Sequence, residues 1–305
     1  MEHSCFLCSV ENPERIVRGR SAFFGKRFVG PPERAHGGLA VGALTCPALR
    51  LAGADGIINP VVTSVSGRLR APVPLETLLQ MGAVATERGA DVTIHDGGTE
   101  YLSGNVEIRD IPTLPGSPIK EPPEYLAEDL AELQKLAGTE LSGSTLVEKY
   151  YQHCHDAGVS DEIDCYGCSE RPHALKLYNR ATEGGDLWTR WATEPEHVDS
   201  SDRLAVSIVT AALDCSNLWV LMAREPDLGV QLRKDDKKLW ITGTHTVHFL
   251  RVPPIDVDYQ VMTRFLRQDG RKGFTMAALL DSEGTPYAVA EAVSILIDVP
   301  KEMTY

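Results

Sequence analysis

The sequence predicts an α+β protein in which one module occurs twice, each copy a buried helix followed by an antiparallel sheet. Two observations support this: four short motifs recur in the same order along 305 residues, and their offset grows from 165 − 5 = 160 to 284 − 98 = 186. Two copies of one module predict an intramolecular pseudo-dimer. The paired motifs are Cys5-Phe6-Leu7-Cys8 with Cys165-Tyr166-Gly167-Cys168, Ala43-Leu44-Thr45-Cys46 with Ala212-Leu213-Asp214-Cys215, Leu69-Arg70-Ala71-Pro72 with Leu250-Arg251-Val252-Pro253, and Gly98-Thr99-Glu100-Tyr101 with Gly284-Thr285-Pro286-Tyr287.

Composition and charge argue against several classes of protein. Hydrophobic residues make up 43% of the chain, enough for a core in each half. No apolar run reaches the roughly 20 residues that cross a bilayer, and no secretory signal follows Met1. We therefore expect a cytoplasmic protein with reduced cysteines and no membrane partner. The net charge of −13 argues against broad nucleic-acid binding. The basic segment 14–34 is either a solvated face or a contact for a phosphorylated ligand.

The first copy is expected to begin with a strand region at 19–30 and a proline turn. Ala35-His36-Gly37-Gly38 then opens an apolar run at 39–44, which is typical of a buried helix. Alternating and β-branched segments predict four strands, and Asp96-Gly97-Gly98 predicts a hairpin turn. The four strands are expected at 59–70, 77–87, 91–95 and 101–109.

Five prolines in 111–123 predict a stiff linker. Helices are expected at 124–137 and 144–156, and leucines spaced by three and four residues predict that the first helix straps the linker onto the domain surface. The expected domains are 1–110, the linker 111–160, and 161–305. The second copy is expected to contain a buried helix at 202–224, N-capped by Ser200 or Ser201, and strands at 239–250, 257–268, 272–281 and 286–297.

The order of these motifs resembles the hotdog fold, and in particular the phenylacetate-type acyl-CoA thioesterases. The resemblance covers both copies but not the connector at 111–160. It implies a tandem (double) hotdog, in which each curved antiparallel sheet wraps a central helix. It also implies hydrolysis of an acyl thioester of coenzyme A or of an acyl-carrier protein. The motifs that carry it are Cys5-Phe6-Leu7-Cys8, His36-Gly37-Gly38, Leu69-Arg70-Ala71-Pro72-Val73-Pro74, Asp281-Ser282-Glu283-Gly284 and Ala290-Glu291-Ala292.

In that family the helix start of one unit faces a carboxylate from the helix of the other unit. His36 and Thr45 are nine residues apart, roughly 13 Å along a helix, so one helix cannot supply both groups. The family expects an acid where the first copy has Thr45 and the second has Asp214. It expects a His where the second copy has Ala205. The resemblance thus implies one composite site and an inactive opposite site. Asp214, His36 and Gly38 are the expected catalytic residues, and Gly37, Thr45, Asn217 and Arg70 the expected substrate contacts.

Simpler interpretations stay open. His36 could be only a helix cap and the glycines only packing positions, whereas a buried Asp214 needs a partner or a function. The same His and Asp would suit a hotdog dehydratase acting on a β-hydroxyacyl thioester or polyketide. A chain with both sites lost would be a non-catalytic acyl-binding protein. Pseudo-dimers of this fold often assemble further, so a homo-oligomer is possible.

The cysteines are expected to pack rather than to bind metal, and no cofactor is expected. The two Cys-x-x-Cys pairs have zinc-ribbon spacing, so a zinc site built from Cys5, Cys8, Cys165 and Cys168 is kept as an alternative. Cys46 and Cys215 hold matching helix positions and are expected to be buried. The segment 153–156 resembles a metal motif but lies in the polar connector.

Overall fold

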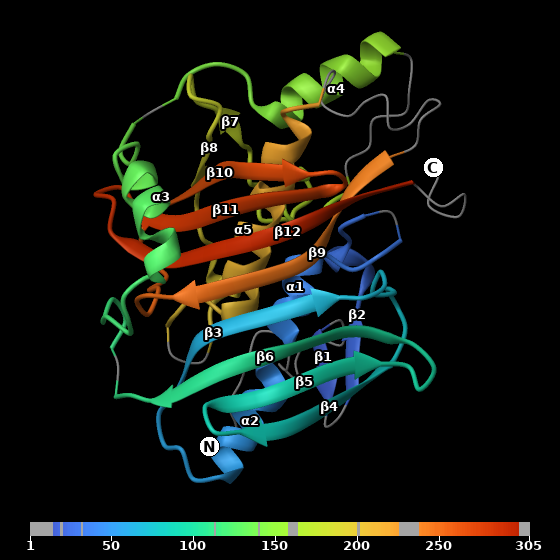
Figure 1. Ribbon diagram of the computed structural model, residues 1–305, viewed down its shortest axis with the longest axis vertical. Coiled ribbons are helices and arrows are strands. Elements are labelled where there is room, and N and C mark those ends of the chain that lie inside the picture. Colours follow the sequence, from blue (N-terminus) through green and yellow to red (C-terminus); the bar gives the residue numbers. More distant parts are fainter. Residues whose placement is uncertain are drawn as a thin grey trace.

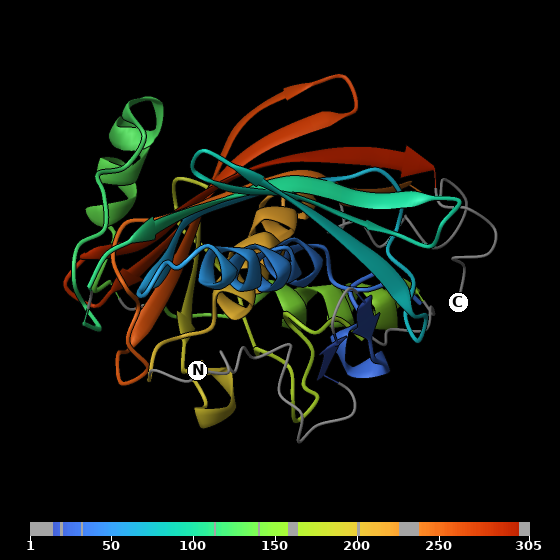
Figure 2. The same cartoon turned by 90° about the horizontal axis from the view of Figure 1, so that it is seen from below.

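The chain forms one continuous antiparallel sheet that curves over its central helices, as Figures 1 and 2 show in two orthogonal views. The computed structural model describes residues 15–18, 21–31, 33–112, 114–139, 141–157, 164–199, 202–225 and 238–298. Cys5, Cys8, Ser200 and Ser201 lie outside these residues. The strand order is β1-β2-β4-β5-β6-β3-β9-β12-β11-β10-β8-β7. Each half therefore contributes the same arrangement in mirror order, and the halves join where β3 pairs with β9.

The elements of the first half agree closely with the strands and helix expected from the sequence. Here β3, β4, β5 and β6 match the four strands expected after the helix. The helix itself extends beyond the predicted apolar run, because α2 follows α1 with one residue between them. The elements are β1 (Arg15–Arg18), β2 (Ser21–Phe24), α1 (Gly37–Ala43), α2 (Thr45–Ala54), β3 (Pro60–Leu69), β4 (Leu79–Thr86), β5 (Gly89–His95) and β6 (Glu100–Asp110).

The second half repeats this order around a single long helix. Its four long strands lie where the sequence predicted them, but β7 and β8 were not predicted. Strand β8 pairs with β10 as β2 pairs with β4. Only five residues form β8, and such a short aromatic segment carries little periodicity to identify it. The elements are β7 (Arg180–Ala181), β8 (Leu187–Trp191), α5 (Val206–Met222), β9 (Lys238–Phe249), β10 (Tyr259–Asp269), β11 (Lys272–Asp281) and β12 (Pro286–Asp298).

Backbone contacts show that the two halves are structural copies. Val29 bridges Ala35, and Val198 bridges Leu204, an offset of 198 − 29 = 169. A bulge in β3 skips Thr63 in its pairing with β6, and a bulge in β9 skips Gly243 in its pairing with β12, an offset of 243 − 63 = 180. Because irregularities are repeated along with the regular elements, the sequence repeat reflects one duplicated fold.

One of the four motif pairings is wrong by one residue. The amides of Arg70 and Leu250 each donate to the carbonyl of the tyrosine that follows the hairpin turn, Tyr101 or Tyr287. Arg70 therefore corresponds to Leu250, an offset of 250 − 70 = 180, rather than to Arg251. The identical letters of the two motifs favoured the wrong alignment, whereas backbone hydrogen bonds set the register of a sheet.

The core lies between the sheet and the central helices. The continuous helix 37–54 is long and apolar enough to cross a membrane by length and composition alone, but 61% of it is buried inside the protein. In α5, fourteen of the helix residues are buried, among them Asp214 and Asn217. A helix that is apolar on nearly all sides is typically buried on all sides. The helix 37–54 and α5 therefore form the centre of the core, and the sheet wraps around them.

The connector packs on the molecule through two helices, α3 (Glu124–Gln134) and α4 (Leu146–Ala157). Leu126, Leu130 and Leu133 of α3 are buried against Met262 and Met276, on the sheet face away from the central helices. The leucine spacing therefore predicted the buried face of α3 correctly. Helix α4 buries its own apolar side chains in the main core, where Tyr150 contacts Trp219 at the end of α5.

Candidate active site

The two central helices cross in opposite directions and nearly touch. A Cβ added at Gly38 would lie 2.4 Å from both the Cβ of Asp214 and the carbonyl oxygen of Thr210. One at Gly42 would lie 2.4 Å from the Cα of Ser207. Only glycine allows backbones to approach this closely. The approach brings the start of α1 against the middle of α5, the arrangement that a composite site requires.

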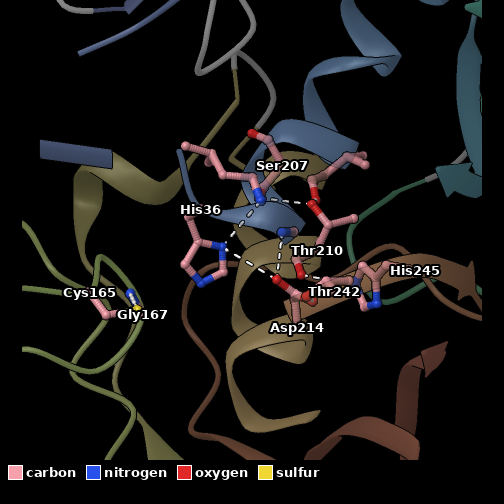
Figure 3. Close-up of polar contacts among 11 residues, drawn as sticks. His36, Cys165, Gly167, Ser207, Thr210, Asp214, Thr242 and His245 are labelled. Carbon is pink, nitrogen blue, oxygen red and sulfur yellow. Dashed lines mark hydrogen bonds and ion pairs between the residues drawn. The ribbon is translucent and has the colours of Figure 1, made fainter. Parts of the chain in front are cut away.

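His36 is the N-cap of α1 and is 2% exposed. Its Nδ1 accepts a hydrogen bond from the amide of Leu39 at 3.4 Å and lies 3.7 Å from Oδ2 of Asp214. Burial alone would lower the pKa of His36. The hydrogen bond to Cys165 and the charges of Cys165 and Asp214 together raise the pKa by more than burial lowers it, so the pKa lies above its ordinary value. Figure 3 shows the imidazole between Asp214 and the turn that contains Cys165.

Asp214 is 1% exposed and accepts two short hydrogen bonds, one from each half of the chain. The amide of Gly38 donates to Oδ2 at 2.6 Å, and the hydroxyl of Thr242 donates to Oδ1 at 2.7 Å. A buried carboxylate is tolerated when such donors compensate for lost hydration. The free amides at a helix N-terminus also favour negative charge, so the start of α1 holds the carboxylate in place.

Two further residues of this group, Thr242 and His245 on β9, were not predicted from the sequence. His245 is fully buried, and its Nε2 lies 3.1 Å from the carbonyl oxygen of Thr210. Burial lowers the pKa of His245 despite the opposing effect of Asp214. A neutral ring that donates through Nε2 leaves Nδ1 as an acceptor, which has no hydrogen-bond partner within the described residues. The polar positions of β9 were the only sequence signal, and they resemble ordinary strand alternation.

The other predicted residues occupy different surroundings. A Cβ at Gly37 would lie 3.1 Å from Oδ2 of Asp214, so Gly37 belongs to the same group. Asn217 is fully buried, and its amide group has no hydrogen-bond partner among the residues described. Thr45 is buried, and its hydroxyl donates to the carbonyl of Gly42 at 2.7 Å. Arg70 is half-exposed and pairs with Glu100 at 2.5 Å, so the structure does not bring it into the buried group.

The position related by the internal symmetry lacks the imidazole and the carboxylate of this site and the hydroxyl of Thr242. An offset of 169 relates His36 to Ala205 and Asp214 to Thr45, and an offset of 180 relates Thr242 to Val62. Ala205 is the N-cap of α5 and provides no side-chain cap, so the prediction that Ser200 or Ser201 caps this helix is wrong. A small cavity of about 60 Å³ lies there instead, lined largely by apolar residues that include Leu49, Val62, Leu204 and Val206.

The site is closed in this structure. The amide of Gly38, which could polarise a carbonyl group, is occupied by Asp214. The turn Cys165–Cys168 covers the outer edge of the His36 ring, and the ring of Tyr166 packs on those of Phe28 and His36. Access to the buried pair therefore requires the Asp214 oxygen to leave the helix start and the turn to move aside.

Comparisons with known proteins support the fold. No protein-family model and no curated protein sequence matches the chain. Among solved structures, one named as a thioesterase II from Thermobifida fusca YX has a TM-score of 0.52 and 11% identity, covering 92% of this chain and 94% of that one. A hot dog fold protein of unknown function from Alicyclobacillus acidocaldarius has a TM-score of 0.52 and 14% identity, with coverages of 93% and 96%. The dehydratase domain of PpsC from Mycobacterium tuberculosis, in complex with C12:1-CoA, has a TM-score of 0.52 and 15% identity, with coverages of 87% and 86%.

The protein therefore has a double hotdog fold, and its structural neighbours include thioesterases and a dehydratase. The resemblance to double-hotdog thioesterases predicted from the sequence is confirmed at the level of the fold. At these identities the neighbours do not assign a reaction to this chain.

Proposed function

We propose that the protein hydrolyses an acyl thioester of coenzyme A or of an acyl-carrier protein at one composite site per chain. The observation that carries the proposal is the correlated difference between the two symmetry-related positions. One position holds His36, Asp214 and Thr242 in contact, and the other has Ala205, Thr45 and Val62. We interpret three groups that occur together at one position and are absent together from the other as a functional unit. If they served only for packing, there would be no reason for all three to occur at the same one of the two positions.

The proposed reaction uses the groups that meet at the crossing of α1 and α5. The thioester carbonyl oxygen replaces Asp214 as the acceptor of the hydrogen bond from the Gly38 amide. The positive end of α1 then stabilises the developing oxyanion. Asp214 removes a proton from water, whose oxygen attacks the carbonyl carbon. The carbon–sulfur bond then breaks, and the proton passes to the leaving thiolate, yielding a carboxylic acid and a free thiol. Thr242 and His36 position the carboxylate.

Dehydration of a β-hydroxyacyl thioester is the second candidate. The observation that favours it is the imidazole–carboxylate pair itself, with Nδ1 of His36 3.7 Å from Asp214. In this reaction the imidazole removes the proton next to the carbonyl, and the protonated carboxyl group donates to the leaving hydroxyl. The PpsC dehydratase domain shares the fold.

A panel of acyl-CoA thioesters, assayed for free thiol, tests the proposal. Asp214→Asn keeps the shape of the side chain, removes the base and is expected to lower kcat/KM by about 100- to 10,000-fold. Asp55→Asn, an exposed carboxylate at the end of α2, is the matched control and is expected to leave the rate unchanged. A mass loss of one water from a hydroxyacyl substrate, without thiol release, would identify the dehydratase instead.

The third candidate, a non-catalytic acyl-binding protein, has its own outcome in the same assay. For such a protein, neither the native chain nor Asp214→Asn would release thiol or dehydrate any substrate of the panel. Binding of a hydrolysis-resistant acyl-CoA analogue, measured by calorimetry, would then persist in both the native protein and the variant.

A further inference from the structure

A cluster of three cysteines and one histidine lies beside the proposed site, and the proposed reaction does not use its thiols. A ring nitrogen of His36 and the sulfur atoms of Cys165 and Cys215 all lie within 4.8 Å of one another. The thiol of Cys168, from the same turn as Cys165, lies next to the thiols of Cys165 and Cys215. All three cysteines are reduced, and His36, Cys168 and Cys215 are buried.

The residue types and their spacing suit a tetrahedral metal site. Zinc binds thiolates at about 2.3 Å, which places the sulfurs of a tetrahedral site about 3.8 Å apart. The ligand atoms of His36, Cys165 and Cys215 lie within 4.8 Å of one another, so these three need to move inward by only about 1 Å, and the thiol of Cys168 must turn toward them as the fourth ligand. Cys165 and Cys168 have the two-residue separation of zinc-binding turns. Helix α1 supplies the histidine, the turn supplies two thiols, and α5 supplies the last thiol, so the four ligands come from three segments.

The turn is shaped around this cluster. A Cβ at Gly167 would lie 2.5 Å from the sulfur of Cys215 and 3.2 Å from Nε2 of His36, so only glycine lets the turn close over them. The amide of Gly167 points to the sulfur of Cys165 at 3.4 Å, and a hydrogen bond to sulfur favours the thiolate. Tyr166 fastens the turn to the first half by donating its amide hydrogen to the carbonyl of Val29 at 2.6 Å.

The two ring nitrogens of His36 face different neighbours. Nε2 faces the cysteine turn, and Nδ1 faces Leu39 and Asp214. A metal on Nε2 requires the proton on Nδ1, since a ligating imidazole is neutral. The protonated Nδ1 would then donate to Asp214, 3.7 Å away, and would no longer accept the long 3.4 Å bond from the Leu39 amide; histidine ligands commonly donate in this way to a carboxylate.

We propose that Cys165, Cys168, Cys215 and His36 bind one zinc ion, which links the cysteine turn to the start of α1 and to α5. Binding releases the thiol protons of the ligating cysteines to solvent. The ligand set differs from the four-cysteine set considered from sequence, because His36 and Cys215 replace Cys5 and Cys8. Zinc binding does not require that the protein hydrolyses thioesters, but it affects the proposed chemistry through His36. A metal on Nε2 leaves His36 unable to act as the base of a dehydratase, whereas Asp214 and the Gly38 amide stay available.

Cobalt substitution and metal analysis of the full-length reduced protein test the proposal. We expect bound zinc after purification and dialysis, and we expect cobalt added to the metal-free protein to give charge-transfer and intense visible bands of tetrahedral cobalt thiolate. Cys215→Ser is expected to lose one equivalent of zinc and to weaken the thiolate band. Cys154→Ser, which alters a buried cysteine of α4 outside the cluster, is the matched control and is expected to change neither readout.

Clear outcomes would overturn the proposal. These are the absence of a cobalt–thiolate band in the folded native protein, an identical band in Cys215→Ser, or a disulfide between Cys165 and Cys168 in protein prepared without oxidant. The native spectrum decides the question even if a variant fails to fold, which circular dichroism detects. His36→Gln is expected to shift the visible bands, because an oxygen ligand replaces nitrogen, and an unshifted spectrum would remove His36 from the ligand set.

Discussion

Replacing Gly42 by alanine tests the closest approach between the two halves of the molecule. The added Cβ would lie 2.4 Å from the Cα of Ser207 and 2.4 Å from the hydroxyl oxygen of Thr210. The first atom belongs to the backbone of α5 and cannot rotate away. Ordinary carbon–carbon contacts are about 3.5–4.0 Å, so the helices must separate by roughly 1 Å or more at their crossing.

The magnitude follows from two opposing effects. Alanine favours a helix over glycine by at most about 1 kcal/mol. Overpacking a close contact costs typically about 1–3 kcal/mol, and more when a backbone must move. We therefore expect a net destabilisation of about 1–3 kcal/mol, which corresponds to a Tm lower by about 2–5 °C in a chain of this size. Separating the helices also lengthens the 2.6 Å bond between the Gly38 amide and Asp214, so activity is expected to fall as well.

Thermal unfolding followed by circular dichroism measures the effect, and Gly53→Ala in the same continuous helix is the matched control. Gly53 is exposed, so alanine there adds helix propensity without a collision and is expected to leave Tm unchanged or slightly higher. If Gly42→Ala is as stable as Gly53→Ala, the helices tolerate a side chain at their crossing and the argument from close approach is wrong.

Three further predictions concern other contacts. Thr242→Val removes a hydrogen bond to the carboxylate of the proposed site and is expected to lower kcat/KM by about 10- to 100-fold, since such bonds contribute about 1.5–3 kcal/mol; an unchanged rate in the thiol-release assay would contradict this role. Leu133→Ala removes a fully buried side chain beneath α3, at an expected cost of about 2–5 kcal/mol, and limited proteolysis should cut α3 faster than in the exposed control Leu114→Ala. Nε2 of His248, 3.9 Å from Glu291, and the hydroxyl of Tyr125, which donates to it at 2.5 Å, hold the pKa of Glu291 below its usual range. The contribution of Glu291 to stability is therefore present above about pH 4.3 and is lost as the pH falls through the lowered pKa. In Glu291→Gln that part of the acid dependence of Tm should be absent, and an unaltered profile would count against it.

The elements that repeat over many residues could be predicted from the sequence. The strands that became β3, β9, β10 and β11 were located within about two residues, because half-buried strands impose alternation on the residues themselves. The leucines of α3 identified its buried face for the same reason, with a helical period. Strand β8 was missed because its few residues pair with β10, and pairing between distant segments leaves little local pattern.

The candidate site was predictable only in part. The count of nine residues from His36 to Thr45, and its counterpart from Ala205 to Asp214, indicated which half supplied each group. Thr242 was not predicted, because its importance comes from a bond to Asp214 made across the core. The closed state of the site was equally invisible, since it depends on the Asp214 oxygen occupying the Gly38 amide.

The sequence by itself determined the duplication, the class of fold and the unequal distribution of the polar residues, because each is written in the order and spacing of side chains along the chain. The tertiary structure alone decided which of those side chains meet. The glycines of α1 allow the helices to approach until an amide of one half bonds a carboxylate of the other, and the tertiary structure also brings the thiols of Cys165 and Cys215 to His36. Distances between segments more than a hundred residues apart depend on packing, and no local pattern encodes them.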